Sequence, residues 1–385
     1  MIVVSNYSHY HTPYQVQGIF EADNKADVLY YNAVNPKRIS RICRDVPNSN
    51  IHNLFWKFFP QTVCRKINIA NGWWDEIADD KYENLVIKGL QNINEIEIFH
   101  AFNCSALKTM DVLPNHVIKI VECGVHPQTY QNYCLEEYEK LGVTREPLST
   151  HFIEKSIEEF KRADYILTIS KICVDSFASN CIPEKKIILL PIASNLKGFE
   201  RTQKRNERFT ILFVGRVTVL KGVQYLVDAC RTLLSKGYDI ECWIVGPITD
   251  EYMKTMSRED YDERVKFMGA VPPEKLPFYY SAASVFIMPS VIDSFCMSVY
   301  ESMACGTPVI VSDRVGATVH HGRDGFVYPF GDIDAMIESI VKFYDNRDLI
   351  EEYGASAKIA ASARGWREYG SELLNLYNSL KRNRV

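Results

Sequence analysis

The 385-residue sequence lacks long hydrophobic runs, closely spaced cysteine pairs and an excess of charge of one sign. No apolar run approaches the roughly 18 residues that a transmembrane helix needs, so we expect none. The opening residues, MIVVSNYSHYH, carry no basic segment, which favours a first β-strand over a signal peptide. The 11 cysteines are scattered without a C-x-x-C pair, which indicates buried free thiols in a reducing, cytoplasmic compartment.

Two signatures of nucleotide-binding proteins are also absent. The chain has neither G-x-G-x-x-G nor G-x-x-x-x-G-K-[ST], so dinucleotide-dependent dehydrogenases and P-loop nucleotidases lose their main support. Its 44 basic and 48 acidic residues give a formal net charge of −4, which argues against a general polyanion binder and predicts no nucleic-acid partner. A composition of 46% hydrophobic and 24% charged residues is that of a globular protein.

Short runs rich in Val, Ile, Leu and Phe recur along the chain, with helical stretches between them. Because these runs are nearly continuous rather than alternating, they predict strands of parallel sheets buried on both faces. The predicted strands are 2–5, 28–31, 96–102, 117–123, 165–170, 187–190, 210–215, 241–246, 265–269, 285–289, 308–312 and 325–328. A helix is predicted over 223–235, where the apolar residues fall on one face.

The length suits about two domains of 150–200 residues each. A polar, basic stretch over 197–208 separates two series of β–α units, so we predict two Rossmann-like, doubly wound α/β domains that face a cleft. Their expected limits are residues 1–195 and 209–365. An amphipathic helix over 366–380 is expected to pack back on the first domain, which segment 366–385 would complete.

The segment FVGRVTVLKG, which begins at Phe213, places glycines and two cations between a predicted strand and a predicted helix. Gly215 at the strand end allows the backbone to approach a ligand. Arg216 and Lys221 lie beside the positive end of the helix that follows Gly222. This is suitable chemistry for a diphosphate. A surface loop with two solvated cations is the simpler alternative.

A second polar segment follows the predicted strand 285–289. Asp293 lies in the loop after that strand, and Glu301 lies eight residues on, in the next helix. The backbone N–H groups of 294–298 would form an anion site at the helix N-terminus. Asp293 would reach sugar hydroxyls and Glu301 the hydroxyls of a ribose. The alternative is an N-capping aspartate followed by an ordinary helical glutamate.

Taken in order, these segments resemble glycosyltransferase family 4, whose members are retaining, nucleotide-sugar-dependent enzymes of GT-B fold. In the second half the resemblance is carried by ILFVGRVTVLKGVQYLVDA, CWIVGP, VKFMGAVPPEKLPFYYSAASVFIMPS, the Asp293–Glu301 segment and ACGTPVIVSDRVGATVHHGRDGFVYPFGD. In the first half it is carried by FHAF, ECGVHP, DYILTIS and IPEKKIILLPIAS. The resemblance implies a GT-B fold, a nucleotide-sugar donor, and no metal or other cofactor.

The resemblance also implies roles for individual residues. The donor diphosphate would be bound by Gly18, in the loop after the first strand, and by Arg216, Lys221, Met297 and Ser298. The nucleoside would contact Val271 and Glu301. The donor sugar would contact His126, Asp293, Ser294, Phe295 and Cys296. The catalytic set would be His126, Asp293, Arg216 and Lys221. His100 would be either a structural support or a functional residue.

The sequence departs from the family pattern at three points. Asp293 replaces the first glutamate of an E-x7-E motif, whose second glutamate Glu301 matches, and its carboxylate is one methylene shorter. Ser294-Phe295-Cys296 occupies the position of Gly-Phe-Gly, so the amides remain but in more crowded surroundings. Gln17-Gly18 stands where two adjacent glycines are usual.

The implied activity is transfer of a sugar to a hydroxyl of a glycan or lipid-linked glycan, with retention of anomeric configuration. In the front-face route the hydroxyl attacks on the side that the diphosphate leaves, and the departing phosphate oxygen takes the proton. Two alternatives stay open, a sugar-nucleotide epimerase of the same fold and a non-catalytic nucleotide-sugar-binding subunit. A phosphorylase would need a longer chain and a lysine for pyridoxal phosphate.

The acceptor side is expected in the first domain, where charge is concentrated. Residues 35–66 contain seven basic residues and one acid, with the aromatic residues of 54–59 among them, and the two tryptophans of 73–74 follow. Basic residues beside exposed aromatic residues suit an anionic membrane surface or a lipid-diphosphate acceptor, so segment 35–74 predicts a peripheral membrane contact. The alternative is an aromatic core with a solvated basic face.

Overall fold

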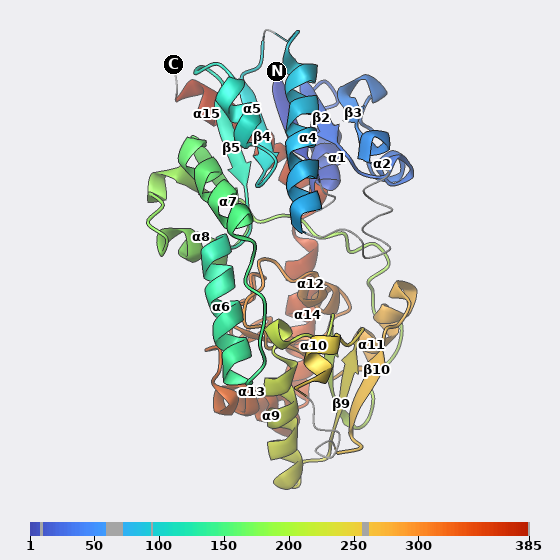
Figure 1. Ribbon diagram of the computed structural model, residues 1–385. Helices are drawn as coiled ribbons and strands as arrows, with labels where there is room; N and C mark the ends of the chain where they lie inside the picture. Colours follow the sequence, from blue (N-terminus) through green and yellow to red (C-terminus); the bar gives the residue numbers. More distant parts are fainter. Residues whose placement is uncertain (8–10, 59–71, 94, 256–261, 384–385) are drawn as a thin grey trace.

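The computed structural model of the chain describes residues 1–7, 11–58, 72–93, 95–255 and 262–383. The chain forms two lobes, each built around a parallel sheet that is flanked by helices (Figure 1). In both sheets the strand order reverses beside the first strand, which is the Rossmann-like order. The prediction of two doubly wound domains in the GT-B arrangement is therefore confirmed.

The first sheet has seven strands in the order β3-β2-β1-β4-β5-β6-β7. Its strands are Ile2–Asn6 (β1), Val28–Asn32 (β2), Ile51–Asn53 (β3), Ile98–Phe102 (β4), Ile118–Glu122 (β5), Tyr165–Thr168 (β6) and Ile187–Leu189 (β7). Its helices are Thr12–Ala22 (α1), Pro36–Ile42 (α2), Gly72–Leu90 (α4), Leu107–Val112 (α5), Pro127–Lys140 (α6), Thr150–Arg162 (α7) and Lys171–Ala178 (α8).

The second sheet has six strands in the order β10-β9-β8-β11-β12-β13. Its strands are Phe209–Val214 (β8), Ile240–Val245 (β9), Val265–Gly269 (β10), Val285–Met288 (β11), Val309–Ser312 (β12) and Gly325–Tyr328 (β13). Its helices are Val223–Ser235 (α9), Asp250–Met253 (α10), Leu276–Ala282 (α11), Met297–Ala304 (α12), Ile333–Asp345 (α13) and Asp348–Ser362 (α14), and α15 (Trp366–Arg382) follows.

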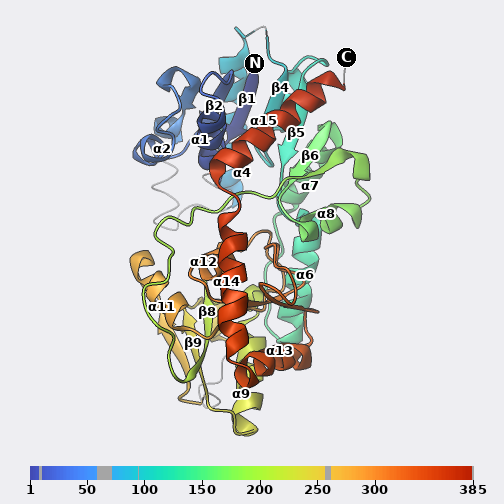
Figure 2. The ribbon, with the colours of Figure 1, turned by 180° about the vertical axis from the view of Figure 1, so that it is seen from behind.

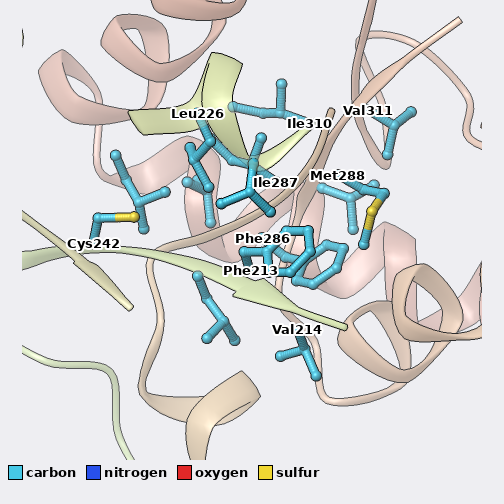
Figure 3. Close-up of a cluster of buried hydrophobic side chains, with 14 of the residues drawn as sticks. Phe213, Val214, Leu226, Cys242, Phe286, Ile287, Met288, Ile310 and Val311 are labelled. Atoms are coloured by element: carbon cyan, nitrogen blue, oxygen red, sulfur yellow. The ribbon is translucent and has the colours of Figure 1, made fainter. Parts of the chain in front are cut away.

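Each predicted strand corresponds to a strand of the structure, and helix α9 has the predicted limits. The agreement reflects burial on both faces, since every residue of β8 and β11 is buried. Figure 3 shows side chains of both strands, Phe213 and Phe286 among them, packed in the core of the second domain. The sequence pattern missed only β3, because Ile51-His52-Asn53 is short and contains one apolar residue.

Nine of the ten described cysteines are buried, and all ten are free thiols, as expected. Cys64 lies outside the described residues. None of the helices in the described part of the chain combines the length and hydrophobicity needed to cross a membrane.

Helix α6 belongs to the first half of the sequence, and part of it packs on the second domain. Cys134 and Tyr138 are buried in the core of the second domain. The Glu137 carboxylate accepts hydrogen bonds from Gln224 Nε2 (2.8 Å) and Tyr225 Oη (2.7 Å) of α9. Figures 1 and 2 both show α6 running from one lobe along the other.

The C-terminal helix returns to the first domain, as the sequence predicts. Figure 2 shows α14 and α15 following one another from the lower lobe to the upper one, where α15 lies across the sheet. Helix α15 contacts α1 closely at two glycines. A Cβ on Gly18 would lie 2.1 Å from the Trp366 carbonyl oxygen, and one on Gly370 would lie 2.1 Å from the Gly18 carbonyl carbon.

This contact corrects the prediction for Gly18. The residue was expected in a loop with its N–H facing a diphosphate, but it lies inside α1 and is buried against α15. Glycine is required there because two helix backbones touch, which is a packing constraint rather than a ligand contact.

The substitution Gly370→Ala is expected to lower the free energy of unfolding by about 1–3 kcal/mol, because the added methyl group would force α1 and α15 apart. A fall in Tm of several degrees in thermal unfolding would show it. Ser371→Ala, at an exposed position of the same helix, is the control and should leave Tm nearly unchanged. Equal stability of the two variants would contradict the proposed packing constraint.

Candidate functional site

A cavity of about 450 Å³ lies at the point where the strand order of the second sheet reverses. Arg216 follows β8 and Asp293 follows β11, and these two strands are neighbours in the sheet. Lys221 and Ser294 line the same cavity, together with Tyr130 from the first domain. The structure thus brings together four of the residues that the sequence singled out, at the usual ligand position of such sheets.

The loop between β8 and α9 gives Lys221 a fixed position. Residues Val219–Lys221 form one turn of 3₁₀ helix, which Thr218 Oγ1 caps by accepting the Lys221 N–H (3.3 Å). Gly222 follows with φ +69°, and a Cβ on it would lie 1.9 Å from the Pro289 carbonyl oxygen. Only glycine fits this turn, so the glycine of the motif serves to bring the loop against β11.

Lys221 and Asp293 form an ion pair between Nζ and Oδ2. Burial raises the pKa of Asp293, but the Lys221 charge and hydrogen bonds outweigh it, and the net pKa lies below the usual value. Burial lowers the pKa of Lys221, but Asp293 outweighs it, so the lysine pKa is raised. Both groups are therefore charged at neutral pH.

The second oxygen of Asp293 is also occupied. Oδ1 accepts the backbone N–H groups of Phe295 (3.2 Å) and Cys296 (3.1 Å), so the carboxylate caps the loop before α12. Asp293 does not cap α12 itself, since the N-cap residue of that helix is Cys296 and no side chain caps it. The N-capping alternative for Asp293 is therefore wrong in detail, because its carboxylate holds the preceding loop and pairs with Lys221. The contact of Asp293 with a donor sugar stays a prediction.

The residues that replace the family Gly-Phe-Gly take unequal positions. The Phe295 side chain packs in the core of the first domain and stacks on Tyr300, with ring centroids 4.8 Å apart. Cys296 is buried with φ +59°, in the left-handed region that favours glycine. Met297 and Ser298 begin α12. Two sets of contacts stay predictions. They are the sugar contacts of Phe295 and Cys296 and the contacts of the Met297 and Ser298 amides with phosphate.

The two predicted nucleoside contacts lie apart from the 450 Å³ cavity. Glu301 accepts a hydrogen bond from Tyr280 Oη (2.8 Å), and burial raises its pKa. Val271 is partly buried against the core of the second domain. Neither lines the cavity that holds Arg216 and Lys221. Their roles as ribose and base contacts stay predictions.

His126 does not line the 450 Å³ cavity. It begins α6, its Nδ1 accepts the Gln128 N–H (3.2 Å), and its ring lies 5.4 Å from both Phe160 and Phe177. Burial lowers its pKa to about 4. It lines a different cavity, beside Phe160, and the predicted position beside the donor sugar is therefore wrong. After Gly124 the chain places Val125 in the lining of the 450 Å³ cavity and the His126 ring against Phe160 and Phe177.

A second cavity, of about 310 Å³, adjoins the first and was not predicted. The two share Val125, Tyr130 and Ser294 as lining residues. At its base Glu122, the last residue of β5, pairs with His11 at the start of α1. The signals available in the sequence were a glutamate at the end of the apolar strand IKIVE and a histidine before Thr12-Pro13.

His100 supports this pair from β4. It is buried, its Nδ1 lies 2.6 Å from Tyr377 Oη, and its Nε2 lies 3.3 Å from Glu122 Oε2. The structural role considered for His100 is therefore the one that the geometry favours.

The basic and aromatic segment of the first domain is only partly exposed. Phe55 and Phe58 are buried, whereas Trp56 is 70% exposed. Lys37, Arg41, Arg44 and Lys57 are exposed, and Arg38 is half-buried. Arg65 and Lys66 lie outside the described residues, as do the side chains of Trp73 and Trp74. We call the four exposed cations and Trp56 the basic face.

Within the described residues, no group of three or more His, Cys, Asp or Glu side chains is arranged to hold a metal ion. The candidate ligand groups of the two cavities are instead the Arg216 and Lys221 cations and the His11–Glu122 pair.

Residues 208–346 match the family model of the group 1 glycosyl transferases. The D-inositol 3-phosphate glycosyltransferase of Pseudarthrobacter chlorophenolicus is 30% identical over 180 residues, which are 44% of this chain and 43% of that protein. The capsular polysaccharide biosynthesis glycosyltransferase CapM of Staphylococcus aureus is 26% identical over 225 residues, 54% of this chain and 59% of that protein. The chain thus spans about half the length of the curated relatives it matches.

Solved structures match the whole chain. Sucrose-phosphate synthase from Thermosynechococcus elongatus superposes with a TM-score of 0.71 at 17% identity over 99% of both chains. HepE of Anabaena, in complex with UDP and glucose, superposes with a TM-score of 0.66 at 14% identity, over 98% of this chain and 100% of that one. The chain therefore has the fold of these proteins, and its residues 208–346 are similar to the group 1 glycosyl transferases.

Proposed function

We propose that this protein transfers a sugar from a nucleotide-diphosphate sugar to a hydroxyl of a glycan or lipid-linked glycan. The observation that carries the proposal is the joint position of Arg216 and Lys221 in one cavity at the switch point of the second sheet. The match of that domain to group 1 glycosyl transferases supports it, as do relatives whose names are those of glycosyltransferases. Nothing in the comparisons favours an epimerase or a non-catalytic subunit.

In the proposed reaction the donor diphosphate lies against Arg216 and Lys221. As the bond between the anomeric carbon and the phosphate oxygen breaks, negative charge grows on the leaving group, and the two cations stabilise it. The acceptor hydroxyl attacks from the same face, so the anomeric configuration is retained. The phosphate oxygen that leaves is itself basic enough to receive the hydroxyl proton in this route.

Arg216→Ala is expected to lower kcat for sugar transfer by roughly 100- to 1,000-fold, since it removes one donor to the leaving group. Arg216 is exposed, so Tm should not change. The measurement is release of UDP or GDP from a panel of UDP-glucose, UDP-galactose, UDP-N-acetylglucosamine and GDP-mannose, with water or an octyl glycoside as the acceptor.

Lys236→Ala is the matched control, because it removes an exposed cation from the opposite end of α9. It should leave both kcat and Tm unchanged. If Arg216→Ala turns over as fast as Lys236→Ala, Arg216 does not bind the leaving group.

We propose that the transfer needs no metal ion, because the two cations already supply the positive charge that a metal would bring to the diphosphate. Turnover of the donor should therefore be the same in excess EDTA as in added Mg²⁺ or Mn²⁺. Loss of activity in EDTA that either metal restores would show that the cations alone are insufficient.

We propose that the protein is cytoplasmic and meets its acceptor at an anionic membrane through the basic face. Lys37→Glu/Arg41→Glu/Arg44→Glu should weaken co-sedimentation with phosphatidylserine-containing vesicles by ~100-fold or more at low salt, at about 1 kcal/mol per cation. Binding of the natural sequence should also fall as salt is raised.

The control for charge alone is Lys204→Glu/Lys236→Glu/Lys254→Glu, which reverses three exposed cations of the second half of the chain. This variant should bind the vesicles as the natural sequence does. Equal loss of binding in both triple variants, or binding that salt does not weaken, would refute the assignment of the basic face.

A further inference from the structure

The 310 Å³ cavity contains a histidine and a carboxylate that the proposed leaving-group chemistry does not use. His11 is the N-cap residue immediately before α1, and its Nε2 is hydrogen-bonded to Glu122 Oε1 at the end of β5. The His11 side chain is 15% exposed and lines the cavity, whereas the Glu122 side chain is 2% exposed. The pair therefore presents the imidazole, backed by a buried acid, to whatever occupies the cavity.

The Glu122 carboxylate is held in place by side chains from α1 and β4. Oε2 accepts a hydrogen bond from Gln15 Nε2 (2.8 Å), and His100 Nε2 lies 3.3 Å from the same oxygen. Gln15 Nε2 also lies 2.8 Å from Tyr369 Oη of α15. Among the described residues, the other titratable groups that face the pair are His100, Tyr369, Tyr377 and Cys123.

The surroundings decide which nitrogen of His11 carries a proton. Burial alone would raise the pKa of Glu122, but the charge and hydrogen bonds of His11 and His100 outweigh it, so the pKa lies below its usual range. An ionised carboxylate only accepts hydrogen bonds, so Nε2 of His11 must be the donor. In the neutral ring Nδ1 then carries the lone pair. Nδ1 has no hydrogen-bond partner among the described residues.

The cavity is suited to hold an acceptor beside the donor. Its walls are mostly apolar, with Phe102, Leu148, Phe152 and Ile169 among them. Because it shares Ser294 with the cavity that contains Arg216, Lys221 and Asp293, a hydroxyl bound in it would lie next to the donor. Few polar groups in an apolar cavity are typical of a site that orients one reacting group.

We infer that His11, oriented by Glu122, is the base that takes the proton of the acceptor hydroxyl. The inference rests on the proposed function and changes only the destination of that proton. The hydroxyl oxygen forms the new bond to the anomeric carbon, the bond to the diphosphate breaks, and its electron pair leaves with the diphosphate. The proton moves to Nδ1 of His11, and Glu122 stabilises the imidazolium until the proton passes to water.

The test compares His11→Gln with the natural sequence in the same panel of nucleotide sugars, with water or an octyl glycoside as the acceptor. Glutamine keeps an N–H for Glu122 but cannot accept the proton. The expected result is a loss of roughly 100- to 10,000-fold in kcat, with KM for the donor little changed.

Two further variants separate chemistry from structure. His11→Ala should recover activity when imidazole is added, which a residue of purely structural importance would not do. His151→Gln, at an exposed position of α7, should keep the kcat and pH profile of the natural sequence.

If His11→Gln keeps kcat, the departing phosphate takes the proton and the inference is wrong, while the proposed transfer stands. If imidazole does not restore His11→Ala, the base assignment is also wrong. A natural sequence that turns over no sugar in the panel overturns the proposed function and this inference together.

Discussion

The close packing of α15 on α1 is the constraint on which the first domain and its cavity depend. At Gly18 and Gly370 the two helix backbones touch, so the position of one helix fixes the position of the other. This contact places Tyr369 and Tyr377 of α15 within hydrogen-bonding distance of Gln15 and His100. A segment that follows the second domain in the chain thereby completes the surroundings of a carboxylate in the first.

In the second domain the ion pair of Lys221 and Asp293 likewise fixes two segments of the chain relative to each other. Asp293 caps the loop before α12 through Oδ1 and holds Lys221 through Oδ2, so one carboxylate joins the loops that follow β8 and β11. A diphosphate that binds Lys221 would share this cation with Asp293. The Asp293 side chain is one methylene shorter than the glutamate of the resembled family. In this chain both of its carboxylate oxygens bind groups of the protein.

The fold could be predicted because continuous apolar runs report burial on both faces of a sheet, a property that depends on nearby residues alone. The cluster of Arg216, Lys221, Asp293 and Ser294 could be predicted for a related reason, since each follows a strand whose carboxyl end faces the cleft. In contrast, the placement of His126 depends on a turn of one or two residues, which decides whether the ring faces the cleft or the core. The sequence does not encode that choice in a readable pattern.

The pair of His11 and Glu122 was beyond sequence reasoning for another reason. The residues are 111 positions apart, and only the strand order β1-β4-β5 brings them together. Each residue alone has an unremarkable local explanation, as a helix-starting histidine or a strand-ending glutamate. The significance of the pair follows from burial and from hydrogen bonds supplied by other elements, which arise only once the chain is folded.

Ser294 shows how a departure from a family pattern acquires a physical role. Its hydroxyl oxygen accepts the Val125 N–H across the cleft (3.3 Å), a hydrogen bond that the glycine usual at this position could not form. A Cβ on Gly124 would lie 2.6 Å from the same oxygen. Residue 124 must therefore be glycine for this hydrogen bond to form. The serine therefore ties the loop after β11 to the residues after β5, at a position three residues beyond Glu122. Because Ser294 also lines both cavities, any opening of the cleft that breaks this bond changes the two cavities together.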